Sequence, residues 1–419
     1  MEELHIHTAI HSRYQVFDAS GQHPFSIVFG LCRRSPNDTD PRPIVLHAAN
    51  SVLDVPYAIA HRLLTLHEHH GKEGRQEKPI DFPAGQLQLP ESEAAGTYLS
   101  LPSPVDRTAH WKDAMTVYQY QVTPNSELAS VLQPGRKYTI RLAGKDLGVK
   151  WWTYGDDTDN PPSRRNHSNK VPTTTTTKAS ETTRLINSKS SAGRASFAVV
   201  PELPRPPKVE THMRLSRSSA DRANLDEGDD DHPRAPLEIS VLHTGAQPLT
   251  VQTRGPQRFL IPWGPFQPEE IETSRPLIIN AAAASPAPAP TSSLQVVDAG
   301  TGEVVVRAPA KHVGCAGLTA GNVDPRPRLD TLVTLMPGEP LVRRVDISGL
   351  VKGKGVPDGR YRVQMLPRGM WWCGGSCTEM RNEGDGERVP WQWYRKEIPP
   401  LMLETDDTVD VRVENGKIR

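Results

Sequence analysis

Apolar and polar residues alternate with a period of two in short segments throughout the chain. Clear examples are residues 117–122 (VYQYQV), 138–142 (YTIRL) and 361–365 (YRVQM). This period places one face of a strand on a core and the other face in water. Turn residues, mainly Pro and Gly, separate the segments, and no helical crossover pattern lies between them. The pattern predicts an all-β fold of antiparallel β-sandwiches.

The alternating segments recur in the same order in the two halves of the chain. Residues 20–27 (SGQHPFSI) match 244–251 (TGAQPLTV) in residue type and spacing. A strand, a Pro/Gly turn, a second strand and a tryptophan pair follow in each half, and a Pro-Pro step before a last strand is shared by 206–215 and 399–413. We therefore predict tandem duplicated, immunoglobulin-like β-sandwich domains at 1–216 and 236–419, joined by an acidic linker at 217–235.

Three further segments depart from the strand pattern. Residues 156–194 contain Ser, Thr, Pro and charged residues with little apolar surface, which predicts a disordered insertion in the first domain. An Ala/Pro-rich stretch at 281–293 is predicted to be a flexible loop of the second domain. The amphipathic residues 55–69 are the best helix candidate, because apolar side chains recur there at helical spacing.

Composition narrows the class of protein. The chain has 40 prolines in 419 residues, which disfavours long helices. Lys plus Arg and Asp plus Glu number 49 each, so no overall field favours nucleic acid or an anionic membrane. The N-terminus lacks the basic and apolar regions of a signal peptide, and no apolar run is long enough to span a membrane. We expect a cytoplasmic or nuclear protein.

Two resemblances to known families rest on short motifs. Residues 336–339 (MPGE), the strand at 341–347 and residues 359–363 (GRYRV) resemble the N-terminal β-sandwich of deuterolysin-type metalloprotease precursors. That resemblance implies a sandwich fold without the protease, since the chain has no His-Glu-x-x-His motif. Residues 147–152 (LGVKWW) resemble two-domain β-sandwich proteins of filamentous fungi, and this resemblance implies no function.

Tryptophan is the residue type that most suggests binding. Adjacent residues on a strand point to opposite faces, so one member of each pair, 151/152 and 371/372, should lie in the core and the other should meet solvent or a loop. Exposed indoles could stack on sugar rings or anchor a protein partner, although core packing is the simpler explanation. The candidate ligand-binding residues are Trp152, Trp371, Trp372, Trp391 and Trp393.

Histidine and cysteine offer weaker candidates for a metal site. His312, Cys315, Cys373 and Cys377 are of zinc-ligand type, but the usual Cys-x-x-Cys spacing is missing and the first domain lacks equivalent residues. A second possibility is the histidines on predicted strand and helix faces, for which solvated surface is the simpler explanation. These are His5, His7, His67, His69 and His70. We expect no metal and no cofactor.

The chain contains no recognisable catalytic motif. Our leading hypothesis is a non-catalytic protein-interaction or scaffold protein, whose partner is another protein and neither nucleic acid nor membrane. The alternatives are an enzyme or accessory factor with a dispersed site between the domains, and a glycan or small-ligand binder that uses Trp371, Trp391 and Trp393.

Overall fold

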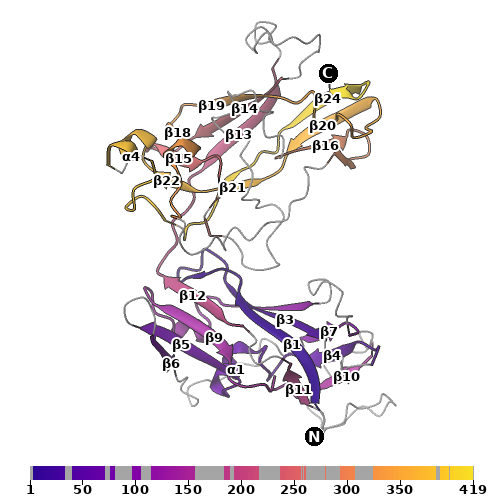
Figure 1. The fold of residues 1–419 in the computed structure, drawn as a ribbon, viewed down its shortest axis with the longest axis vertical. Helices are drawn as coiled ribbons and strands as arrows, with labels where there is room; N and C mark the ends of the chain where they lie inside the picture. Colours follow the sequence, from indigo (N-terminus) through magenta and orange to yellow (C-terminus); the bar gives the residue numbers. More distant parts are fainter. Residues whose placement is uncertain are drawn as a thin grey trace. The chain divides into compact units, whose positions relative to one another are not determined.

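A computed structural model of the chain describes residues 3–33, 40–70, 76–80, 97–104, 115–155, 184–188, 193–216, 236–255, 257, 259–260, 279, 293–306, 324–383, 387–395 and 397–418. These residues form two compact units that divide between Leu203 and Pro204. Both units consist of strands with a few short helices, so the predicted all-β fold class is confirmed (Figure 1). No helix in the described part of the chain is long and apolar enough to cross a membrane.

The first unit contains three sheets that share one core (Figure 1). In hydrogen-bonding order, the first sheet is β11 (Arg184–Asn187), β1 (Glu3–Ser12), β3 (Ser26–Arg33) and β8 (Thr116–Gln121). The second is β10 (Trp152–Tyr154), β4 (Ile44–His47) and β7 (Tyr98–Leu101), and the third is β2 (Val16–Asp18), β12 (Ala195–Val200), β9 (Lys137–Leu142), β5 (Leu64–His70) and β6 (Gln76–Ile80). The helices are α1 (Val55–Ala60) and α2 (Glu127–Ser130).

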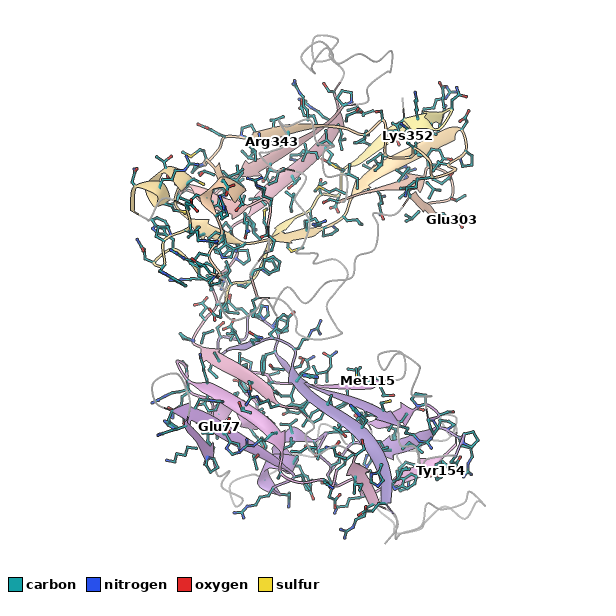
Figure 2. All side chains as sticks on the ribbon, viewed as in Figure 1. Glu77, Met115, Tyr154, Glu303, Arg343 and Lys352 are labelled. Carbon is teal, nitrogen blue, oxygen red and sulfur yellow. The ribbon has the colours of Figure 1, made fainter. Side chains whose placement is uncertain are left out.

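Alternation along β1 shows how the sequence builds this core. Ile6 and Ile10 are fully buried, whereas His5 and His7, on either side of Ile6, are only half-buried and lie on the opposite face. The same period holds in β12, where Phe197 and Val199 enter the core and Ser196 is exposed. Side chains from all three sheets fill the interior of the unit (Figure 2). Burial of alternate side chains therefore supplies most of the driving force for this unit.

The second unit has four sheets. The first is β13 (Val209–Leu215), β14 (Pro236–His243) and β19 (Leu341–Asp346), and the second is β18 (Leu332–Leu335), β15 (Leu249–Gln252) and β22 (Trp372–Gly374). The third is β17 (Val304–Val306), β16 (Leu294–Asp298), β20 (Gly359–Met365), β24 (Thr408–Glu414) and β25 (Lys417–Ile418). The fourth pairs β21 (Arg368–Met370) with β23 (Leu401–Leu403). A short helix, α4 (Cys377–Glu383), follows β22, and a 3₁₀ turn (Leu329–Thr331) precedes β18. The unit has a main core and a smaller one around Trp371, which we call the aromatic core. Its buried members are Phe259, Leu329, Leu332, Trp371, Cys373, Met380, Val389 and Ile398.

The two units share one recurring arrangement. A tyrosine near the start of a strand bonds to backbone a few residues upstream: Tyr138 Oη accepts from the Gln133 amide, and Tyr361 Oη donates to the Pro357 carbonyl, both at 2.9 Å. Such a bond recurs in β-sandwiches. In both units the tyrosine strand then pairs antiparallel with a later strand, β9 with β12 and β20 with β24.

Other pairings differ between the units. β1 pairs with β3 in the first unit, whereas β14 pairs with β13 and β19 in the second and β15 lies in another sheet. The internal duplication therefore stays a prediction.

The predicted helix at residues 55–69 is correct only in its first half. Helix α1 ends at Ala60, and the chain turns at Arg62, whose φ of 57° lies in the left-handed region. Strand β5 then begins at Leu64 and buries Leu64 and Leu66 at a period of two. Because Leu63 and Leu66 also continue the helical spacing of Val55 and Ile59, periodicity alone could not separate the two structures.

The predicted boundary between the domains at residue 216 is wrong. Strand β13 pairs along its whole length with β14, from Val209↔His243 to Leu215↔Leu237, and therefore belongs to the second unit. Residues 217–235 lie outside the described residues, and the strands before and after them, β13 and β14, are neighbours in one sheet. The last strand of the first unit is instead β12, which pairs with β9.

Two segments predicted to lack structure are partly ordered. Within 156–194, residues 184–187 form β11, parallel to β1, because Leu185 and Ile186 are buried and the Asn187 side chain accepts a bond from the Thr8 amide at 3.3 Å. The rest of that segment lies largely outside the described residues, as does 281–292, whereas Ser293 is fully buried and its carbonyl accepts from Leu366.

We predict that β13 is required for the second unit to fold stably. A fragment of residues 204–419 should unfold cooperatively, and a fragment of residues 217–419 should be less stable by at least about 3 kcal/mol, because loss of a buried side chain such as Met213 alone costs about 2–5 kcal/mol. Urea titration followed by circular dichroism measures both values. Equal stability of the two fragments would restore the boundary at residue 216.

Candidate binding site: an arginine strip beside Trp391

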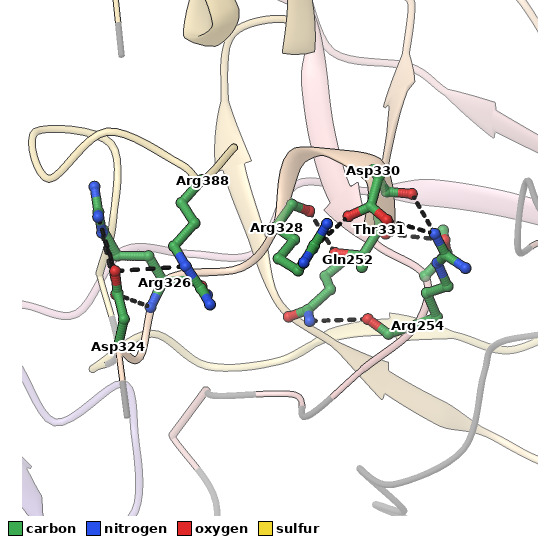
Figure 3. Close-up of polar contacts among 9 residues, drawn as sticks. Gln252, Arg254, Asp324, Arg326, Arg328, Asp330, Thr331 and Arg388 are labelled. Atoms are coloured by element: carbon green, nitrogen blue, oxygen red, sulfur yellow. Dashed lines mark hydrogen bonds and ion pairs between the residues drawn. The ribbon is translucent and has the colours of Figure 1, made fainter. Parts of the chain in front are cut away.

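The segment before β18 carries charged residues at every second position; it is extended as far as Arg328 and then enters the 3₁₀ turn at Leu329. Asp324, Arg326, Arg328 and Asp330 alternate with Pro325, Pro327 and Leu329. In an extended chain alternate side chains share one face. Pro327 and Leu329 are buried, and Leu329 belongs to the aromatic core, whereas Arg328 and Asp330 are exposed and Asp324 and Arg326 are partly buried. We call these four charged residues, together with Arg254 and Arg388, the arginine strip (Figure 3).

A neighbouring segment holds the strip in place. The Leu329 amide donates to the Glu387 carbonyl at 2.9 Å, and the Val389 amide donates to the Pro327 carbonyl at 3.0 Å. Arg388 Nη1 also donates to the Arg326 carbonyl at 2.7 Å. Because both backbones are bonded, the charged side chains project from a fixed frame.

At one end of the strip, Asp324 lies between two arginines. Arg326 Nη2 is 2.8 Å from the Asp324 carboxylate, and Arg388 Nε is 3.6 Å from it. Hydrogen bonds from Arg326, and then the charges of both arginines, lower the pKa of Asp324 to about 2. The carboxylate is therefore ionised at any physiological pH.

The other end repeats this arrangement around Asp330. Arg254 Nη2 lies 2.8 Å and Arg328 Nε 3.1 Å from the carboxylate. Burial opposes ionisation of Asp330, but the hydrogen bond from Arg328 and the charges of Arg328 and Arg254 outweigh it, so the pKa falls below its usual value. Figure 3 shows the two groups next to each other along the segment. Four arginines share two aspartates, which leaves the strip with a net charge of +2.

Trp391 stands at the Asp324 end of the strip. The residue is 62% exposed, the largest exposure among the large apolar side chains that the structure describes. The Arg326 guanidinium lies 4.8 Å from its ring centroid, and the Tyr394 ring meets it edge-on at 6.0 Å. Arg326 is itself fixed by Asp324 and only 10% of its side chain is exposed. The indole is therefore oriented by a cation–π contact and remains accessible.

The other tryptophans of this region are packed. Trp371 has no exposure, and its Nε1 donates to the Arg395 carbonyl at 2.7 Å. Trp372 is partly buried and donates to the Pro399 carbonyl at 3.0 Å. Trp393 is also partly buried and packs on the same aromatic core, near Gly375. Of the five predicted binding tryptophans, the structure gathers four here and exposes only Trp391.

In the first unit, the tryptophan predicted to bind a ligand is the buried member of its pair, and its neighbour is the exposed one. Trp152 was the predicted binding residue, but it is only 7% exposed and lies in the core. Trp151 is 41% exposed and meets the Tyr98 ring at 5.6 Å. Alternation correctly predicts one buried indole per pair; it does not indicate which one.

The predicted metal ligands do not gather in the described part of the chain, where no three His, Cys, Asp or Glu side chains could hold an ion. His312 and Cys315 lie outside the described residues. Cys373 is buried and Cys377 partly so; both are free thiols, and burial, followed by the nearby Cys377, raises the pKa of Cys373.

The predicted surface histidines lie on strands of the first unit. His5 and His7 share the outward face of β1, as expected. His67, His69 and His70 lie on β5 and not at a helix end, which corrects the prediction. His69 Nε2 is 2.7 Å from Thr139 Oγ1, and His70 Nε2 is 3.5 Å from the Glu68 carboxylate. The contacts of His69 and His70 are those of ordinary sheet surfaces, whereas His67 is buried and not on the surface.

Sequence analysis missed the arginine strip. Its signal is the run Asp-Pro-Arg-Pro-Arg-Leu-Asp at 324–330, in which charge alternates with apolar residues at the strand period. The strip presents guanidinium and carboxylate groups next to an exposed indole. Guanidinium groups bind carboxylates through paired hydrogen bonds, and an exposed indole adds apolar contact area.

We predict opposite roles for two tryptophans of this region. Trp371→Ala should destabilise the second unit by about 3–5 kcal/mol because it empties a buried site, whereas Trp391→Ala should cost less than about 1 kcal/mol. Urea denaturation monitored by circular dichroism compares the two variants. Similar losses from both would mean that Trp391 is a packing residue.

We also predict that the Asp324 carboxyl titrates near pH 2, because Arg326 and Arg388 stabilise its charged form. A carboxyl with a lowered pKa stabilises the folded state above its unfolded pKa of about 3.9, and this contribution is lost as pH falls toward 2. Carbon-detected NMR titration gives the midpoint, and Arg326→Gln should move it upward. An unchanged midpoint in that variant would contradict the assigned cause.

No model of a known protein family matches this chain, and no curated protein matches it. The resemblances to deuterolysin-type precursors and to two-domain fungal proteins therefore stay predictions.

Proposed function

We propose that the protein is a non-catalytic interaction protein that holds another protein through the arginine strip and Trp391. The observation that carries this proposal is an indole that is 62% exposed yet oriented by the paired Arg326. Tryptophan and arginine are the residue types most enriched among side chains that dominate the binding energy of protein interfaces. An ordered side chain also loses less conformational entropy on binding than a mobile one.

The charge of the strip indicates the kind of partner. Its net charge of +2 favours a protein surface that presents carboxylates, and the neighbouring indole favours an apolar side chain between them. Arg328 contributes most directly, because 54% of its side chain is exposed while its Nε bonds to Asp330. The guanidinium is held in place and still has donors that face solvent.

The glycan alternative loses its main support. It required Trp371, Trp391 and Trp393 to form an exposed platform, but Trp371 has no exposure and Trp393 packs against the aromatic core. A single exposed indole in contact with a charged arginine suits an acidic protein surface better than a neutral sugar.

The test compares partner retention by full-length protein and two variants. Tagged wild-type, Trp391→Ala and Arg328→Gln proteins are expressed in the source organism, and cross-linked neighbours are measured by quantitative mass spectrometry. We expect at least one acidic neighbour to fall about tenfold or more in both variants, as loss of a central interface residue does.

Val342→Ala is the matched control. Val342 is 39% exposed on β19 of the same unit and lies outside the strip, so its loss should leave the neighbours unchanged. If Trp391→Ala and Arg328→Gln retain every neighbour that the wild-type protein retains, the proposal fails.

A further inference from the structure

Two arginines face each other across β20 and β24. Arg360 pairs directly with Arg412 in the antiparallel register, next to Gly359↔Val413. Directly opposed residues have Cβ atoms about 4.5–5.5 Å apart, and like charges in these positions repel each other. This pair therefore destabilises the sheet unless negative charge lies between the two guanidinium groups.

Only one member of the pair has an acidic partner. Arg412 Nε is 2.9 Å from the Glu414 carboxylate. Within the described ranges, no acidic side chain lies at ion-pair distance from Arg360, and no hydrogen bond engages its guanidinium. The next arginine along the strand differs, because Arg362 faces Asp410 at 3.7 Å and donates to the Ala299 carbonyl at 3.0 Å.

The arginine pair borders a hollow of about 380 Å³. This volume lies within the range of small-molecule sites, about 300–1,000 Å³. The rim is fixed, because the Asn415 amide donates to the Asp358 carboxylate at 2.8 Å and Asn415 turns with a φ of 52°. The hollow is lined by Asp358, Gly359, Arg360, Arg412, Glu414 and Asn415, among others.

We propose that Arg360 and Arg412 bind the phosphate group of a small phosphate monoester in this hollow. Guanidinium groups match phosphate oxygens with paired hydrogen bonds, and a doubly charged anion between them replaces repulsion with attraction. Asp358 and Glu414 can accept hydrogen bonds from hydroxyl groups of the ligand. The same two carboxylates repel a polyanionic chain or an anionic membrane, which favours a small ligand with a single phosphate.

The experiment measures binding of three probes to the full chain by calorimetry at low ionic strength. Glucose 6-phosphate and inorganic phosphate should both bind the wild-type protein, and glucose should not. Arg360→Gln should weaken both phosphate-containing probes at least tenfold. Binding to phosphatidic acid vesicles without binding of the soluble probes would overturn the proposal, as would unchanged affinity in Arg360→Gln.

Arg362→Gln removes the same charge from the same strand and is the matched control. Because Arg362 is already paired with Asp410, its loss should change phosphate affinity by less than about threefold. Equal weakening by the two variants would show that affinity follows net charge alone and would overturn the proposal.

Thermal unfolding gives a second readout that does not depend on the ligand. In phosphate-free buffer, Arg360→Gln should raise the midpoint for the second unit by about 1–4 °C, because it removes the cross-strand repulsion. Arg362→Gln should not raise it. A lower midpoint for Arg360→Gln would contradict the repulsion on which the site depends.

Discussion

Burial of every second side chain against a shared core is the constraint on which the whole structure depends. In β1 it fixes Ile6 and Ile10 inside and leaves the histidines outside. A strand that shifted by one residue would exchange these two faces, so the apolar pattern also sets the register. In the arginine strip, burial of Pro327 and Leu329 likewise anchors the segment and leaves Arg328 between them exposed.

The sequence predicts which segments are strands better than it predicts their neighbours. Alternation in β9, β20 and β24 is clear, and these strands form as expected. Strand β13 alternates equally well, but only its pairing with β14 shows that it joins the second unit. Strand β11 has two apolar residues, too few to stand out, and is recognisable only from its parallel pairing with β1. Partner choice is a long-range property that local composition does not encode.

The candidate site was predictable in part. Trp391 belonged to the expected binding residues, whereas its exposure depends on a turn after Pro390 and on the position of Arg326. Trp371 was expected on the same surface, but it fills the centre of the aromatic core. The arginines were overlooked because each one, taken alone, resembles an ordinary surface charge. They form a site because each of two aspartates, Asp324 and Asp330, binds two guanidinium groups, and no single residue in the sequence indicates this arrangement.

The paired aspartates have a consequence for the conditions under which the surface can operate. Asp324 and Asp330 both resist protonation, and arginine does not lose its charge in water at any biological pH. With no histidine among its members, the strip keeps one pattern of positive and negative charge from mildly acidic to alkaline surroundings. Any pH dependence of a complex formed there would therefore have to come from titrating groups of the partner, such as its carboxylates, while salt would weaken the complex from either side.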